Sequence, residues 1–210
     1  GPGGAGGGLV LGPAWLSFPV SLVMALAVGI VIGSVNGTLV VRLGINAFIV
    51  TLGTFIAVRG MVVALSGGRS VYGLPDAMRV MAVERFLGVP LLAWALILTY
   101  LVFTLVLTKT PFGRHIFLIG GNVTAAYRAG IKVGGVVFLT FVLSGALAGF
   151  AGWLLASRTA GATANLGVGM LFMAFAAVVI GGVSLRGGQG RLSGVFAGVL
   201  LLSSIQTAIN

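Results

Sequence analysis

Ionisable side chains that could take part in catalysis or metal binding are few in this sequence. Its 210 residues include a single histidine, His115, two acidic residues, Asp76 and Glu84, and no cysteine. A zinc site needs about four His, Cys or carboxylate ligands, and a disulfide needs cysteine. Asp76 and Glu84 lie in one polar stretch among arginines, and nothing near them indicates acid–base catalysis. We therefore expect no catalytic residues, no metal site and no cofactor.

The glycine-rich segments do not form a nucleotide-binding loop. Such a loop reads Gly-x-x-x-x-Gly-Lys-Ser/Thr, but neither Lys109 nor Lys132 follows a glycine. The stretch GGVSLRGGQG at 181–190 does not fit Gly-x-Gly-x-x-Gly either. Arg59 is the only charge inside an apolar stretch, so coupling to a proton or sodium gradient is disfavoured. Any transport by this chain would be driven by a partner or would be passive.

The balance of residue types excludes a soluble protein. Hydrophobic residues make up 59% of the chain, charged residues make up 7%, and the mean hydropathy is +1.20. Soluble proteins carry about 25% charged residues. The net charge of +10 comes from basic residues scattered between apolar stretches, whereas nucleic-acid-binding proteins gather them in a patch. The sequence predicts an all-α membrane protein that is surrounded by lipid and binds no nucleic acid.

Apolar stretches between the charges predict about six membrane-spanning helices. Their expected ranges are 15–41, 45–65, 91–108, 133–157, 168–184 and 192–210. Residues 1–14 are expected to be a flexible glycine-rich stretch, so that a single transmembrane domain would cover 15–210. The pairs Gly181–Gly182 and Gly187–Gly188 could break the chain into a re-entrant turn.

Alternation of these spans predicts which connections share a side of the membrane. Segment 109–132 would share a side with Arg42, Arg186 and Arg191. The opposite side would carry Arg69, Arg79, Arg85 and Arg158. Basic residues are more numerous on the first side, which is therefore expected to be cytoplasmic. The expected location is the bacterial cytoplasmic (inner) membrane.

Glycines recur at every fourth position within the predicted spans. The three rows are Gly29, Gly33 and Gly37; Gly145 and Gly149; and Gly190, Gly194 and Gly198. On a helix this spacing leaves a groove in which a second helix can approach closely. Close helix packing is the main interpretation, and a groove along a substrate path is the alternative.

Segment 109–132, with the sequence KTPFGRHIFLIGGNVTAAYRAGIK, points to a protein partner. Asn122 is a favourable N-cap for a short helix over 123–129, and Gly130 suits a left-handed position after it. A helix of this length cannot cross a membrane. Its two alanines beside a tyrosine and an arginine suit insertion into a cleft of another protein. A simple connector is the alternative.

Seven motifs of this sequence resemble permease subunits of ABC importers of the ribose/simple-sugar type. They are TPFGR at 110–114, IGGN at 119–122, AAYRAGI at 125–131, LSGALAGFAGWLLASR at 143–158, AAVVIGGVSLRGGQGRLSG at 176–194, NAFIVTLGTFIAVRG at 46–60 and SGGRSVYGLP at 66–75. The likeness covers roughly 20–210. Chains of that family have several more helices before this region and one after it, so this chain is expected to be a fragment or a truncated homologue.

The resemblance implies that the short helix is a coupling helix that docks in a groove of an ATP-binding subunit. The residues that would carry this coupling are Gly121, Asn122, Ala125, Ala126, Arg128, Gly130 and Ile131. It also implies a second permease subunit in a homodimer, and a periplasmic or extracellular sugar-binding protein. The chain itself would be no enzyme, because the separate ATP-binding subunit would supply the energy.

Polar residues within the spans are candidates for the path of a sugar or sugar-like solute. They are Asn36, Asn46, Thr51 and Arg59. Hydrogen bonds between helices, or snorkelling of the arginine, are the alternatives. The loop 66–90, with Arg69, Arg79 and Arg85, is a candidate docking surface for the binding protein.

Two other functions are compatible with the sequence. A passive solute channel would need no ATP-binding subunit, and a non-transporting fragment would neither conduct a solute nor bind that subunit. Permeases for branched-chain amino acids or furanone signals are close variants of the main hypothesis.

Overall fold

The computed structural model describes residues 14–68, 71–72, 84–159, 161–163, 166–167, 169–185 and 187–209. Within these ranges the helices are α1 (Ala14–Leu43), α2 (Ala47–Ser66), α4 (Leu91–Lys109), α5 (Pro111–Gly121), α6 (Val123–Arg128), α7 (Val133–Thr159), α8 (Met170–Ile180) and α9 (Leu192–Ile209). The strands are β1 (Val71–Tyr72), which pairs with β4 (Gly161–Ala162), and β2 (Arg85–Phe86), which pairs with β3 (Val89–Pro90). The expected flexible stretch 1–14 lies outside the described residues except for Ala14, which begins α1.

Four of these helices are long and apolar enough to cross a membrane. They are α1 from Pro19 onward, α2, α4 and α7. Large apolar side chains such as Phe48 and Leu98 are exposed on their outer faces, where water would be an unfavourable solvent. A helix satisfies its own backbone hydrogen bonds and can therefore lie in lipid. The prediction of an all-α, multi-pass membrane protein is confirmed, with α8 and α9 as two shorter apolar helices.

Helix α8 is shorter than the span predicted over 168–184. Its 11 residues extend about 16 Å, whereas the hydrocarbon core of a bilayer is about 30 Å thick. The helix ends because Gly181 caps it and Gly182 turns to a φ of 77°. The helix is broken at the predicted glycine pair, and a re-entrant turn at this point stays a prediction.

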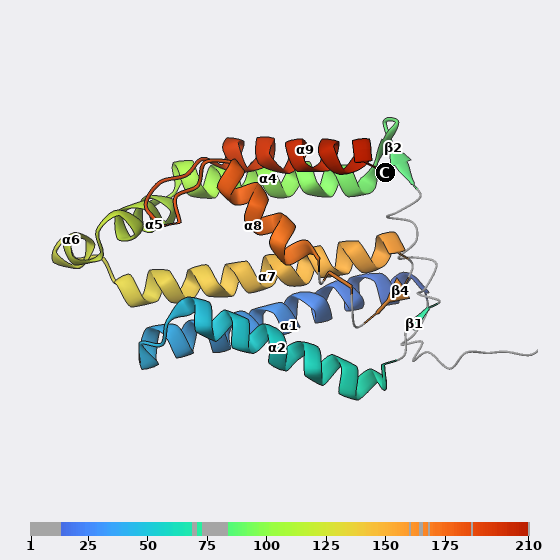
Figure 1. Ribbon diagram of the computed structural model, residues 1–210, viewed down its shortest axis with the longest axis horizontal. Helices are drawn as coiled ribbons and strands as arrows, with labels where there is room; N and C mark the ends of the chain where they lie inside the picture. The colour runs from blue at the N-terminus through green and yellow to red at the C-terminus, as the bar shows by residue number, and fades with distance from the viewer. Residues whose placement is uncertain are drawn as a thin grey trace, which may run out of the picture. The chain divides into compact units, whose positions relative to one another are not determined.

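The described residues gather in two compact units, of which the first comprises 1–95 and 138–166. Helices α1 and α7 lie side by side in it (Figure 1). A Cβ on Gly29 would fall on the carbonyl oxygen of Gly145, and a Cβ on Gly145 would fall on that of Gly29. Gly29 and Gly33 of the first row therefore pack backbone against backbone on α7, as Gly145 and Gly149 do on α1, and this agrees with the close-packing interpretation. Gly37 instead lies against the side chains of Phe138 and Phe141.

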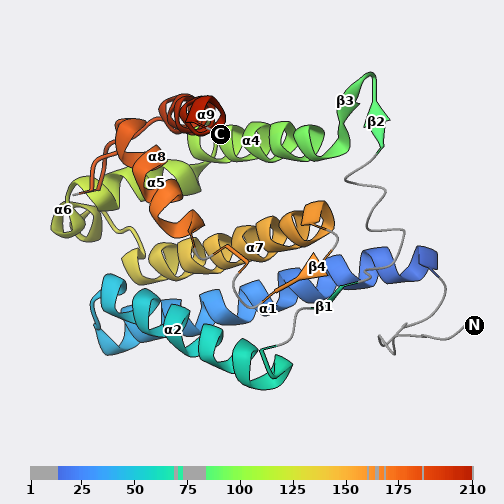
Figure 2. The ribbon, with the colours of Figure 1, turned by 45° about the vertical axis from the view of Figure 1, so that its right-hand side comes forward.

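The second unit comprises 96–137 and 167–210. Its helices α8 and α9 form a hairpin (Figure 2), in which Gly194 packs on Gly181 and Gly198 packs on Ala177. Gly190 lies before the first residue of α9, so the third glycine row is shorter than predicted. The expected single transmembrane domain over 15–210 stays a prediction.

Contacts inside each unit agree with the prediction of which connections lie on the same side of the membrane. In the first unit, β1 pairs with β4, so the segments that follow α2 and α7 meet at one end. Arg42 lies at the other end of α1, toward the beginning of the antiparallel α7. In the second unit, Gly188 contacts Gly120, which places the 187–188 turn at the end of α5. The assignment of one end to the cytoplasm stays a prediction, and Arg186 lies outside the described residues.

Candidate functional site

The segment between α4 and α7 folds as two helices, α5 and α6. Helix α5 begins after Thr110, whose hydroxyl oxygen accepts a hydrogen bond from the backbone N–H of Gly113 at 3.3 Å. Pro111 occupies its first turn, where a missing N–H costs nothing. Helix α5 was not predicted from the sequence, although a threonine followed by a proline is a recognised helix start.

Helix α6 matches the predicted coupling helix to within one residue at its end. The Asn122 side-chain oxygen accepts from the N–H of Ala125 at 2.9 Å, which confirms the predicted N-cap. After the helix, Gly130 has a φ of 79°, and the N–H of Ile131 donates to the carbonyl of Ala126 at 3.1 Å. Asn122 also donates its N–H to Leu118 and so ends α5. One residue thus fixes the bend between the two helices.

Neighbouring residues of α6 differ in exposure. Tyr127 is 74% exposed and Val123, one turn earlier on the same side, is also exposed. Ala126 is only 4% exposed because it faces the chain itself. An exposed aromatic and aliphatic pair on a short helix outside the spans is typical of a docking surface. Of the predicted coupling residues, Ala125 and Arg128 are also exposed and available to a partner.

A groove of about 620 Å³ lies beside α6. It is lined by Tyr127, Arg128, Gly130, Ile131, Lys132, Val133, Gly134 and Gly135. The two cations, Arg128 and Lys132, suit carboxylate or phosphate groups of a partner. Within the part of the chain that the structure describes, no three His, Asp or Glu side chains gather where they could hold a metal ion. The two cations make the groove a candidate for protein recognition.

Asn36, one of the predicted path residues, joins two helices of the first unit. It is buried, and its side-chain oxygen accepts a hydrogen bond from the Thr54 hydroxyl at 2.6 Å. Thr54 was not singled out from the sequence, because the partner of a buried amide depends on which helices pack together. This pair fits the alternative interpretation, in which the polar residue forms a hydrogen bond between helices.

We expect the Asn36–Thr54 bond to contribute about 0.6 kcal/mol to the stability of the first unit, as is typical for such bonds between membrane helices. The variants Asn36→Leu and Thr54→Val, and their combination, form a double-mutant cycle that is measured by unfolding in mixed detergent micelles. Thr104→Val is the control, because the Thr104 hydroxyl donates to the carbonyl of Tyr100 on its own helix. Additive effects of the two changes would contradict this prediction.

The other predicted path residues lie on the exposed surface of the first unit. Asn46 caps α2 by accepting from the N–H of Phe48 at 2.9 Å, and the Thr51 hydroxyl donates to the carbonyl of Ala47 at 2.9 Å. Arg59 is exposed on α2. The structure brings none of these three together with Asn36 in a hydrogen bond that it describes. Their role in a substrate path stays a prediction.

The predicted docking loop 66–90 is described only in part. Arg69 and Arg79 lie outside the described residues, and Arg85 begins the β2–β3 hairpin. The indole N–H of Trp94 donates to the carbonyl of Phe86 at 3.1 Å and so ties the hairpin to α4. A role of the three arginines in docking stays a prediction.

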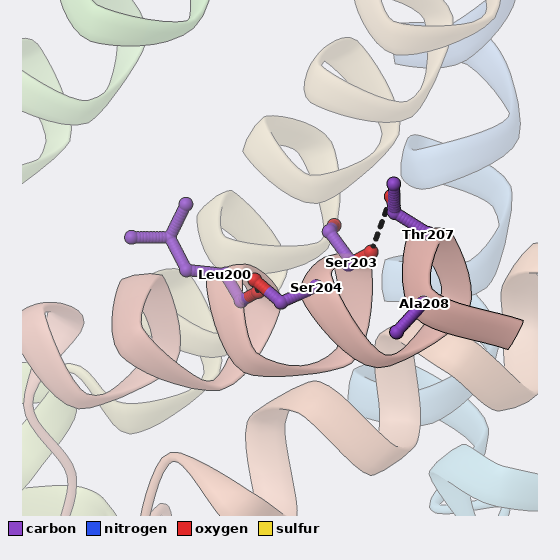
Figure 3. A pocket seen from close by; sticks show the side chains of 5 residues that line it. All are labelled: Leu200, Ser203, Ser204, Thr207 and Ala208. Carbon is purple, nitrogen blue, oxygen red and sulfur yellow. Dashed lines mark hydrogen bonds between the residues drawn. The ribbon is translucent and has the colours of Figure 1, made fainter.

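Helix α9 carries a pocket that was not predicted from the sequence. It has a volume of about 440 Å³ and is lined by Leu200, Ser203, Ser204, Thr207 and Ala208 (Figure 3). The Thr207 hydroxyl donates to the carbonyl of Ser203 at 2.9 Å, and the Ser204 hydroxyl donates to that of Leu200 at 2.8 Å. Each hydroxyl can still accept a hydrogen bond from a solute. The polar run SSIQT within an apolar helix is the signal that could have identified this surface.

Over residues 3–210 the chain matches the family described as branched-chain amino acid transport system / permease component. It is 38% identical over 193 residues to the autoinducer 2 import system permease protein of Enterobacter sp. (strain 638), covering 92% of this chain and 56% of that protein. It is 38% identical over 176 residues to the L-arabinose transport system permease protein of Escherichia coli, covering 84% and 54%.

A third relative is the L-arabinose ABC transporter permease protein of Azospirillum brasilense, which is 38% identical over 194 residues. The match covers 90% of this chain and 57% of that protein. The chain thus spans a little over half the length of these relatives. No solved structure matches the chain.

Proposed function

Because this chain belongs to the family of branched-chain amino acid transport system permease components, we propose that it acts in the transmembrane subunit of an ATP-driven importer. The observation that carries the proposal is α6, a capped helix with Tyr127 exposed beside a basic groove, set between two membrane helices. The relatives named as import or transport permeases support the same function. The proposed location is the bacterial cytoplasmic membrane, with α6 on the inner side.

A separate ATP-binding subunit would supply the energy by docking on α6 and the adjoining groove. Closure of that subunit on ATP would push α6, and the bend at Asn122 would pass the movement to α5. A second permease copy and a sugar-binding protein on the outer side would complete the importer. The proposed coupling residues are Gly121, Asn122, Ala125, Ala126, Arg128, Gly130 and Ile131.

The proposed solute is a sugar or sugar-like molecule. Serine and threonine hydroxyls, without a charged side chain, line the pocket on α9. A free amino acid carries a carboxylate and an ammonium group, and such groups favour charged partners when they leave water. Neutral hydroxyls instead match a hydroxylated solute. This chemistry favours the sugar hypothesis over the branched-chain amino acid variant.

Reconstitution with cognate ATP-binding and solute-binding proteins tests the proposal. We expect labelled solute to enter proteoliposomes only when ATP and the solute-binding protein are both present, and uptake to stop with a non-hydrolysable ATP analogue. Flux through the permease alone would instead establish the passive channel. If the chain neither conducts solute nor retains the ATP-binding subunit, the result would favour the non-transporting fragment.

A further inference from the structure

The end of α5 touches the glycine turn between α8 and α9 within the second unit. A Cβ on Gly120 would fall on the backbone nitrogen of Gly188 and lie 2.9 Å from its Cα. A Cβ on Gly188 would lie 2.7 Å from the Cα of Gly121. Figure 1 shows the turn running alongside α5. Backbone therefore meets backbone here, with no side chain between them.

The glycine turn is braced by its own hydrogen bonds. The N–H of Ser184 donates to the carbonyl of Gln189 at 2.9 Å, and the N–H of Gly187 donates to that of Ser184 at 3.0 Å. Gly187 and Gly188 have φ angles of 89° and 73°, which other residues adopt only with strain. These hydrogen bonds join the two ends of the turn beside α5.

The turn leads directly into a hairpin that is also packed through backbone. Gly194 of α9 lies against the carbonyl of Gly181, and Gly198 lies against that of Ala177. Side chains can change rotamer and absorb a displacement, whereas contacting backbones cannot do so without separating. Backbone contacts thus join α5 to Gly188 and join α8 to α9, and the chain from Gly188 continues into α9, which carries the hydroxyl-lined pocket.

We propose that the Gly120–Gly188 contact transmits the movement of α5 and α6 to the α8–α9 hairpin. Gly120, Gly187 and Gly188 are then positioning residues for transport, in addition to the coupling residues on α6 itself. This inference rests on the proposed function, because it requires an ATP-binding subunit that moves α6. The docking helix α6 and the pocket on α9 would be coupled because both affect the position of the α8–α9 hairpin.

Gly120→Val and Gly188→Ala in the assembled importer test the transmission. Both add a side chain that must push the turn away from α5. We expect the ATP-binding subunit to co-purify at the wild-type ratio and to hydrolyse ATP, while the amount of solute imported per ATP falls by about tenfold. The matched control is Gly152→Val on α7, where a Cβ meets no atom within 4 Å. This variant should import as much solute per ATP as the wild type.

A fluorescent reporter measures the movement without altering the contact. The chain has no cysteine, so Leu185→Cys, at an exposed position in the turn, gives one labelling site. An environment-sensitive dye there should change its emission when ATP binds the assembled complex, and Gly120→Val should abolish the change. An unchanged emission in the otherwise wild-type complex would overturn the inference even if Gly120→Val fails to fold.

Two further outcomes separate the inference from the function on which it rests. If Gly120→Val and Gly188→Ala import solute with the wild-type ATP ratio, or if they release the ATP-binding subunit, the contact does not transmit movement and the inference is wrong. If the wild-type chain itself neither retains that subunit nor imports solute, the proposed function fails before the contact is tested.

Discussion

Replacing Tyr127 by alanine is expected to weaken binding of the ATP-binding subunit by about 100-fold. The reason is that 74% of this side chain is exposed, on a helix that is held against the chain through the buried Ala126. An aromatic side chain that becomes buried at the centre of an interface typically contributes about 2–4 kcal/mol. The dissociation constant is measured by titrating the labelled ATP-binding subunit onto the permease in nanodiscs, and uptake should fall in parallel.

A matched change on another helix shows whether the effect belongs to α6. Phe48 on α2 is 71% exposed, so Phe48→Ala removes a similar exposed aromatic surface. It should leave the dissociation constant close to that of the wild type. Equal weakening by both variants, or full binding by Tyr127→Ala, would show that α6 is not the docking helix.

Local signals account for what could be predicted around α6. A side-chain cap and a left-handed glycine involve atoms only a few residues apart, so Asn122 and Gly130 could be assigned from the sequence. The end of α8 is a different case, because apolar residues continue past Gly181 and hydropathy alone extends the span. The two glycines end the helix even though apolar residues follow them.

Contacts between distant segments account for what could not be predicted. The spacing of Gly190 from Gly194 looks helical, but spacing does not show that α9 begins only at Leu192. The contact of Gly120 with Gly188 joins the end of α5 to the turn between α8 and α9, and one sequence gives no sign of it. For the same reason the sequence could not tell that Asn36 bonds to another helix whereas Thr51 bonds within its own.

The backbone contact of Gly29, Gly33, Gly145 and Gly149 between α1 and α7, here called the glycine seam, gives the largest expected effect on stability. A Cβ on Gly149 would fall on the carbonyl oxygen of Ala25 and lie 3.0 Å from its carbonyl carbon. Gly149→Val must therefore force the two helices apart, and we expect it to lower the free energy of unfolding by about 3 kcal/mol. The measurement is the midpoint of unfolding in mixed detergent micelles, followed by circular dichroism.

Gly152 provides the comparison on the same helix, three residues further along. A Cβ on Gly152 meets no atom within 4 Å, so Gly152→Val should be close to neutral. Similar losses from both variants would mean that valine destabilises α7 itself and that the seam is not responsible.

The pair Gly29→Val and Gly145→Val gives a second test, because each places its side chain on the backbone of the other position. Once one valine has separated the helices, the second meets less resistance, so the double variant should lose less stability than the two single losses combined.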